Sequence, residues 1–283
     1  MLRYLDPRAD LTFKKIFADH DNLLISLLNA MLPLEADQQI EQIQYLPAAM
    51  VPRRTEAEKN SIVDVHCKDS RGRTFLVEMQ MTWAASFKKR VLFNWAKAFS
   101  SQSETGQKFG DLSTVYSLNF VNSNMNIEGY DGYYHHYSVI HRGIYTDIID
   151  GLQLIFIELP KFRPENYAEK RMQVLWLRFL TEINAQTRTV PSELLEDPAV
   201  SQALNIVEIS GYDDTQLLDY DRFWDRVSVQ RTLEEDRNEA VSRLQKAEKK
   251  LDEATVRLRR WAQELRQKGK TDLEIREITG ISL

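Results

Sequence analysis

The sequence predicts an α/β fold, followed by a helical region and a C-terminal coiled coil. Helical and strand periodicities alternate over residues 1–163, short helical patterns dominate residues 164–229, and a heptad repeat occupies residues 230–283. The chain has 283 residues, of which 43% are hydrophobic and 28% charged. That length and composition suit a globular protein of one large or two modest domains.

Two stretches before residue 110 have the periodicity of amphipathic helices. Apolar residues recur at helical spacing across residues 10–32, with a predicted break near Asp19–Asn22 and an end at Pro33. The second stretch, residues 86–104, begins with three consecutive basic residues and carries an apolar side. We expect helices at both places.

Strand patterns lie around these helices. The expected strands occupy residues 40–46, 61–68, 73–82, 113–122, 133–141 and 152–159. A polar, charged linker at residues 52–60 precedes the second strand. The turn sequence Asp-Ser-Arg-Gly joins the second and third strands, which predicts a hairpin there.

A leucine repeat marks the C-terminal segment. Leucines recur every seven residues, and Ala or Trp fills the second apolar position of each heptad; these residues are Leu244, Leu251, Leu258, Leu265, Ala240, Ala247, Ala254 and Trp261. This pattern predicts a coiled coil of about four heptads. We favour self-association, and the alternative is a long helix that lies on its own domain.

The final residues, from Lys268, have the pattern of a partial helix-turn-helix. Thr271 is placed to cap a helix, Ile275 and Ile278 to pack, and Gly280 to turn. The sequence ends where a recognition helix would begin, so we expect no complete DNA-reading motif.

Charge and cysteine content limit the possible classes of protein. The net charge of −5 argues against a general polyanion binder, although a local basic surface remains compatible with it. The single cysteine, Cys67, excludes a disulfide framework and a multi-cysteine zinc site.

The first residues lack a signal-peptide hydrophobic region, and no apolar run approaches the ~20 residues that span a bilayer. We expect a cytoplasmic protein without a membrane partner.

The predicted hairpin carries a carboxylate on each strand. Asp64 lies in the first strand and Glu78 in the second, with Gln80 two positions later on the same face as Glu78. Directly opposed residues share a face, with Cβ atoms about 5 Å apart. A four-residue turn without a bulge would separate the carboxylates, whereas a glycine bulge at Gly72 would oppose them.

Two adjacent carboxylates repel each other unless a cation lies between them. Carboxylate oxygens without a histidine cluster favour a hard ion, so Asp64 and Glu78 indicate Mg²⁺ or Mn²⁺. Such an ion keeps several waters, and one of them can attack a phosphodiester while Gln80 orients the water or the phosphate. The same pattern is also typical of ordinary surface carboxylates on the solvent face of a hairpin.

The ordered set of motifs resembles a known family. The string D-x(13)-E-x-Q, formed by Asp64, Glu78 and Gln80, is similar to the motif of the PD-(D/E)XK nuclease superfamily, and the chain looks most like its recombination-promoting nuclease and transposase branch. The segments DLTFKKIF and KKRVLFNWAKAF resemble helices of that branch, and LIFIELPKF and KGKTDLEIREITGISL resemble its later signatures. The resemblance spans Asp10 to about Phe162 and returns at the C-terminus.

The resemblance implies a restriction-endonuclease-like mixed sheet flanked by helices, and roles for particular residues. Asp64 and Glu78 would be metal ligands and, with Gln80, the catalytic set. Gln80 occupies the position where most of the superfamily has Lys. Because Gln carries no charge, the positive charge near the scissile phosphate would come from Lys14 or Arg90.

The resemblance also makes Asp10 a candidate third acidic ligand from the first helix, and the alternative is a plain helix N-cap. Basic residues that follow or face the carboxylates are expected to contact DNA phosphates. These residues are Lys14, Lys88, Lys89 and Arg90.

We therefore expect a DNA endonuclease that uses Mg²⁺ or Mn²⁺, is related to recombination or transposition, and forms a homodimer through its coiled coil. The expected domains are a nuclease-like domain at residues 1–163, a helical region at 164–229 and a coiled-coil helix at 230–283. The alternative, from another class, is a catalytically inactive nuclease-fold protein that acts as an oligomeric interaction or DNA-binding module.

Overall fold

A computed structural model of the chain describes residues 4–48, 63–103, 108–164 and 171–280. The predicted polar linker at residues 52–60 lies outside these described residues. The chain divides into two compact units, Met1–Val227 and Ser228–Leu283. The first unit contains the whole sheet, and the second contains most of the long C-terminal helix and the short helix that follows it.

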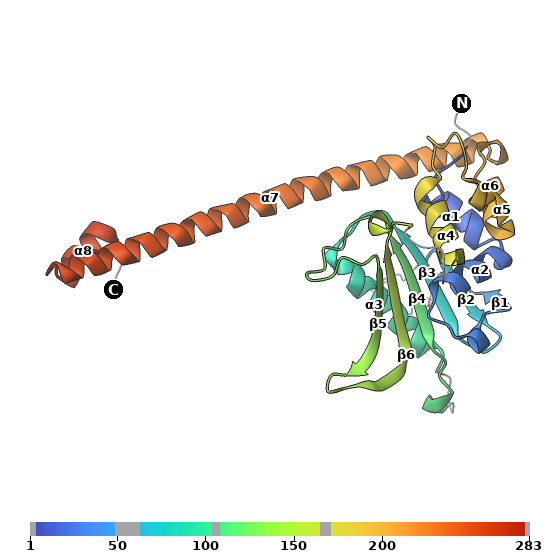
Figure 1. Cartoon of the computed structure of the whole chain (residues 1–283), viewed down its shortest axis with the longest axis horizontal. Helices are drawn as coiled ribbons and strands as arrows, with labels where there is room; N and C mark the ends of the chain where they lie inside the picture. Colours follow the sequence, from blue (N-terminus) through green and yellow to red (C-terminus); the bar gives the residue numbers. More distant parts are fainter. Residues whose placement is uncertain (1–3, 49–62, 104–107, 165–170, 281–283) are drawn as a thin grey trace, which may run out of the picture. The chain divides into compact units, whose positions relative to one another are not determined.

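A six-stranded mixed sheet forms the centre of the first unit (Figure 1). β3 pairs in parallel with β4, and β4 with β6, while the other neighbours are antiparallel. In spatial order the strands are β1 Ile43–Tyr45, β2 Val65–Asp69, β3 Thr74–Gln80, β4 Val115–Val121, β6 Ile144–Glu158 and β5 Tyr134–His141. Together with its flanking helices, this sheet confirms the predicted restriction-endonuclease-like α/β fold.

Helices from both ends of the first unit cover one face of the sheet. Their apolar residues pack against strand residues that include Phe75, Val77 and Phe120. The helices are α1 Asp10–Phe17, α2 Asp21–Met31, α4 Arg171–Glu182, α5 Ser192–Glu196 and α6 Pro198–Ile206. The interruption between α1 and α2 confirms the helix break that the sequence predicts near Asp19–Asn22.

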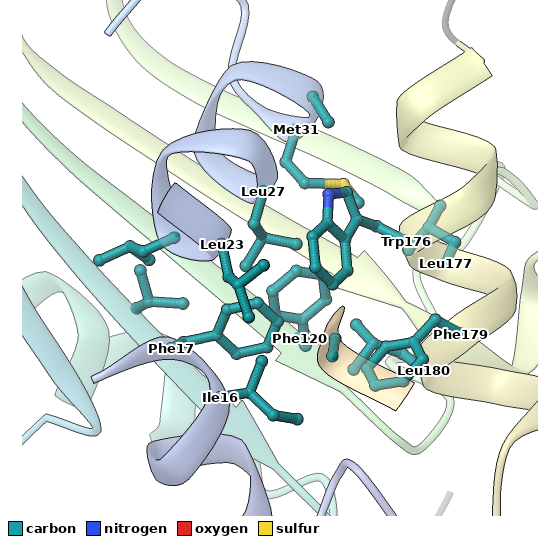
Figure 2. Close-up of a cluster of buried hydrophobic side chains, with 14 of the residues drawn as sticks. Ile16, Phe17, Leu23, Leu27, Met31, Phe120, Trp176, Leu177, Phe179 and Leu180 are labelled. Carbon is teal, nitrogen blue, oxygen red and sulfur yellow. The ribbon is translucent and has the colours of Figure 1, made fainter. Parts of the chain in front are cut away.

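An aromatic cluster joins the helical region to the N-terminal helices (Figure 2). The ring centroid of Trp176 in α4 lies 5.4 Å from that of Phe17 in α1, and both side chains are fully buried. Trp176 Nε1 also donates a hydrogen bond to Ser26 Oγ in α2 at 3.0 Å. Although the sequence separates the helical region from the nuclease-like domain, α4 shares one core with the sheet because its apolar face completes that core.

The opposite face of the sheet is covered by α3, which spans Ala85–Ser101. Phe87 of this helix packs against Phe156 of β6, with ring centroids 6.0 Å apart in an edge-to-face arrangement. Leu76 of β3 also belongs to a buried cluster with α3 residues. Because side chains alternate along a strand, Glu78 and Gln80 face the same side as Leu76, toward α3.

The β5–β6 pair extends further than the sequence indicates. A strand is predicted at residues 152–159, whereas β6 begins at Ile144 and ends at Glu158. Residues 144–150 are exposed, including Ile144, Tyr145 and Ile149. Because no face of this part is buried, its side chains lack the alternation that would have revealed a strand.

The long helix α7, Asp214–Gln267, begins in the first unit and continues through much of the second. The short helix α8, Asp272–Thr279, follows it and starts with a capping box in which Thr271 and Glu274 bond reciprocally. Ile275 is fully buried as predicted, but Ile278 is 45% exposed, so the prediction that Ile278 packs is wrong. Among the described helices, none is long and apolar enough to cross a membrane.

Candidate active site

The turn between β2 and β3 has the geometry of a glycine bulge. Asp69 N donates a hydrogen bond to Arg73 O at 3.0 Å, which closes a connection of three residues. Gly72, the last of the three, adopts φ +80°, a left-handed conformation that glycine accommodates without steric cost. A Cβ atom at this position would also lie 3.0 Å from Ser113 Oγ. Both the backbone conformation and the space therefore favour glycine here.

This turn brings the two strand carboxylates opposite each other. The antiparallel register pairs Val65 with Val77, and continuing it by one residue places Asp64 opposite Glu78. Gln80 ends β3, two residues beyond Glu78 and on the same side of the sheet. The hairpin thus positions three oxygen-bearing side chains close to one another beneath α3.

Glu78 is held by two side chains of α3. Its carboxylate is buried, with 8% of the side chain exposed. Glu78 Oε1 accepts a hydrogen bond from Asn94 Nδ2 at 2.8 Å, and Glu78 Oε2 accepts one from Arg90 Nη2 at 3.1 Å. Arg90 and Asn94 are four residues apart, so they project from one side of the helix. The same Arg90 Nη2 donates to Gln80 Oε1 at 2.8 Å, and one guanidinium therefore bridges Glu78 and Gln80.

Asp64 is held by the backbone of β3 and approached by a lysine of α1. Asp64 Oδ2 accepts a hydrogen bond from Met79 N at 2.7 Å. Lys14 Nζ lies 3.9 Å from Asp64 Oδ1 and 2.6 Å from Asp10 Oδ1. Lys14 is therefore shared between the site carboxylate and its own helical neighbour.

Burial raises the pKa of both carboxyl groups. The pKa of Asp64 rises to about 6, mainly because burial disfavours the charged form, and the charges of Glu78 and Asp10 raise it further. The Met79 hydrogen bond and the charge of Lys14 act in the opposite direction. Burial also raises the pKa of Glu78, against the charge of Arg90 and the hydrogen bonds from Asn94 and Arg90. Negative charge at this site is therefore costly unless cations balance it.

The structure brings five of the eight predicted site residues together and leaves Asp10, Lys88 and Lys89 at or beyond the edge of this group. Arg90 contacts Glu78 and Gln80, Lys14 lies beside Asp64, and the hairpin register places Asp64 opposite Glu78. Asp10 joins it only through Lys14, and its side chain is half exposed. Within the described residues, no group of three or more His, Cys, Asp or Glu side chains is arranged to hold a metal ion.

The two predicted DNA-contacting lysines of α3 have different surroundings. Lys88 Nζ donates a hydrogen bond to Tyr137 OH at 3.0 Å and lies 5.1 Å from the centroid of that ring. Lys88 is therefore directed toward β5, away from the carboxylates. Lys89 is exposed at the surface of α3.

Asn94 was not identified from the sequence. Its residue type matches no catalytic motif, and only its position four residues after Arg90 indicates that it faces β3. Asn94 is buried, with 3% of the residue exposed, and it is the donor for the Glu78 oxygen that Arg90 does not contact.

The donor set fits a hard divalent cation. Asp64, Glu78 and Gln80 present only oxygen atoms as ligands, which Mg²⁺ and Mn²⁺ prefer over the nitrogen and sulfur ligands typical of zinc. Burial is the main cause of the raised pKa of Asp64, and the charge of Glu78 adds to it; a bound cation would offset both effects. Asp64 and Glu78 are thus the residues able to hold such an ion.

One of the comparisons with known proteins identifies a family. The family model described as PD-(D/E)XK nuclease family transposase matches residues 7–232 of the chain. This span includes every residue of the candidate site, all six strands and the first part of α7. Comparisons with curated proteins and with solved structures gave no match.

Proposed function

Because the chain belongs to the PD-(D/E)XK nuclease family transposases, we propose that it is a divalent-metal-dependent DNA endonuclease acting at Asp64 and Glu78. One observation carries the proposal: two carboxylates lie opposite each other in a hairpin, with a bridging guanidinium beside them. A purely structural hairpin gains nothing from this arrangement, because burial makes the charge of both carboxylates unfavourable.

Asp64 and Glu78 would hold Mg²⁺ or Mn²⁺ through their carboxylate oxygens. The bound ion supplies charge stabilisation for a phosphodiester and lowers the pKa of water to the point where it can attack. Met79 N and Asn94 Nδ2 each fix one carboxylate oxygen, and the other oxygens, which face Arg90 and Lys14, are the ones that a metal ion would take. Gln80 is placed to orient the attacking water or the phosphate, since its amide donates and accepts hydrogen bonds.

Arg90 supplies the positive charge that Gln80 lacks. Its guanidinium lies 2.8 Å from Gln80 Oε1, so it brings a cation to the place that a lysine at residue 80 would reach. The side chain of Arg90 is 53% exposed, which leaves it accessible to a phosphate from solvent. An arginine suits this role because its planar group can contact two phosphate oxygens at once.

DNA would approach along the basic side chains that surround the carboxylates. Lys14 is 40% exposed beside Asp64, and Lys89 is exposed on α3 near Arg90. These residues would contact backbone phosphates, which position a duplex without reading its sequence. The acidic chain as a whole therefore binds DNA through a local basic surface.

A homodimer would place two such sites on one DNA. In the second unit three of the four leucines of the heptad repeat are exposed, at 60% for Leu244, 67% for Leu251 and 36% for Leu258. A bare heptad seam on a long polar helix is stabilised when a second identical helix covers it. Two hydrolytic sites in one dimer would permit cleavage of both strands.

A plasmid-nicking assay tests the proposed activity. Wild-type protein should nick supercoiled plasmid with Mg²⁺ or Mn²⁺ and lose this activity in EDTA, whereas Asp64→Asn and Glu78→Gln should be inactive under all three conditions. Asp131→Asn, at an exposed carboxylate, is the matched control and should nick like the wild type. Wild-type protein that binds DNA but never nicks it would instead favour the catalytically inactive, DNA-binding module.

A further inference from the structure

A pocket of about 440 Å³ lies between α1 and the first turns of α7, next to the carboxylate site. The α1 residues that line it include Leu11, Lys14 and Lys15, and those of α7 include Gln216, Phe223 and Arg226. The spacing of each set places it on one side of its helix. All of these residues belong to the first unit.

Lys14 connects this pocket with the proposed active site. Its ammonium group lies 3.9 Å from Asp64 Oδ1, and the same residue lines the pocket. The Lys14 side chain therefore lies beside both the pocket and Asp64. A molecule that fills the pocket would lie next to the place where the phosphodiester would be cleaved.

The charged side chains that line the pocket balance one another: three are carboxylates, Asp10, Asp19 and Asp219, and three are cations, Lys14, Lys15 and Arg226. Asp10 is paired with Lys14 at 2.6 Å, and Asp219 is paired at 3.2 Å with Arg222, which lies outside the lining. A pocket without net charge suits a ligand that carries few charges better than a polyanion.

The cations Lys15 and Arg226 differ in their freedom. Lys15 Nζ donates to Gly211 O at 3.0 Å and lies 3.7 Å above the ring of Tyr212, so its position is fixed. The side chain of Arg226 is exposed and makes no hydrogen bond or ion pair within the residues that the structure describes. Arg226 is therefore available to bind an anion.

The pocket also offers an aromatic surface. Phe223 is half-buried and is held by an edge-to-face contact with Trp224, with ring centroids 5.4 Å apart. Leu11 extends the apolar wall on the side of α1. A planar aromatic ring that stacks on Phe223 would cover both apolar side chains, and Gln216 supplies a nearby amide.

We propose that this pocket binds one nucleotide of the cleaved strand, next to the scissile phosphate. The base stacks on Phe223 and its phosphate contacts Arg226. This inference rests on the proposed endonuclease function and adds a substrate contact from α7. Stacking of bases on aromatic side chains is tolerant of sequence, so the pocket would fix the position of the strand without selecting a particular base.

The test measures DNA binding without cleavage. The full chain carrying Asp64→Asn is mixed in EDTA with a single-stranded oligonucleotide that contains a fluorescent adenine analogue, and both affinity and fluorescence quenching are recorded. Phe223→Ala should raise Kd by roughly 5- to 150-fold and abolish the quenching, since that range corresponds to the loss of one base–aromatic stack. Phe223→Tyr should retain the quenching, because it keeps the ring.

Arg226→Ala should also raise Kd, and because the Arg226 side chain is exposed, the substitution removes no core packing. The matched controls are Phe109→Ala, at a phenylalanine that is 85% exposed, and Arg237→Ala, further along α7; both should bind like the parent. Parental binding by Phe223→Ala and Arg226→Ala together would overturn the inference, as would an equal loss in the controls. Failure of wild-type nicking would refute the endonuclease proposal. The binding result could still be interpreted, because it is measured without cleavage.

Discussion

Replacing Asp64 by asparagine should stabilise the metal-free protein at neutral pH. The pKa of Asp64 is raised from 3.8 to about 6, chiefly by burial. The folded state therefore holds a proton on Asp64 that the unfolded state releases between these two pH values. As a consequence, ionised Asp64 lowers the free energy of unfolding, and this penalty grows from about pH 4 to about pH 6 and is constant above.

The change in the free energy of unfolding can be calculated from the pKa shift of Asp64. A change of about two pKa units corresponds to about 3 kcal/mol, which is an upper bound because 22% of the Asp64 side chain is exposed to water. Asn keeps an oxygen that can accept the Met79 N–H hydrogen bond, so the substitution removes the charge and preserves the contact. We expect Asp64→Asn to be more stable than wild type by about 1–3 kcal/mol near pH 8 and nearly equal to it near pH 4.

Urea unfolding at both pH values measures the difference in the free energy of unfolding between wild type and Asp64→Asn. Added Mn²⁺ should then reduce or reverse that difference. A ligand at a hundredfold excess over Kd that binds only the folded state adds about 2.7 kcal/mol to stability. Mn²⁺ should add this amount to wild type and to the exposed control Asp131→Asn, and should leave Asp64→Asn nearly unchanged. Two results would refute the reasoning: a difference between wild type and Asp64→Asn that does not depend on pH, or an equal response of both proteins to Mn²⁺.

Three further predictions concern the helices around the site and the seam. Leu251→Lys with Leu258→Lys should give monomers in sedimentation analysis, and an unchanged mass would show that the seam does not hold a dimer. Arg90→Met should bind Mn²⁺ more tightly in calorimetry, because a competing cation leaves Glu78, yet it should nick plasmid more slowly; weaker Mn²⁺ binding would contradict this. Asn94→Ala should lower the free energy of unfolding at pH 8 by about 1–3 kcal/mol, since a buried Glu78 oxygen loses its donor. No loss in urea unfolding would exclude Asn94 as the support of Glu78.

Most elements of the fold could be predicted from local patterns. The helices at residues 10–31 and 85–101 each bury one side, and the buried strands carry continuous or alternating apolar residues, so their periodicity was informative. The first half of β6 could not be found this way, because the only constraint on it is its pairing with β5. The place of α4 was equally hidden, since its amphipathic pattern shows that it buries Trp176 but not which surface it covers.

The candidate site could likewise be predicted only in part. Contacts within one hairpin could be expected from the sequence, whereas contacts between distant elements could not. The opposition of Asp64 and Glu78 depends on a turn within the same hairpin, so the position of Gly72 was enough to expect it. The contacts of Asn94 depend on how α3 lies across the sheet, which apolar packing around Phe87 determines. The pocket beside the site requires two helices about two hundred residues apart in the sequence, and neither helix carries a pattern that indicates the other.

The pairing of Arg90 with Gln80 gives a physical reason for the departure from the usual motif. A lysine at residue 80 would place an ammonium group beside the guanidinium that contacts Glu78, and two cations at that distance repel each other. Glutamine avoids this repulsion and accepts a hydrogen bond from the arginine instead. In the proposed site, α3 therefore supplies the positive charge that a lysine on the strand would otherwise provide. A neutral residue at position 80 and an arginine at position 90 are thus two parts of one arrangement, and changing either alone should disturb the site more than changing both.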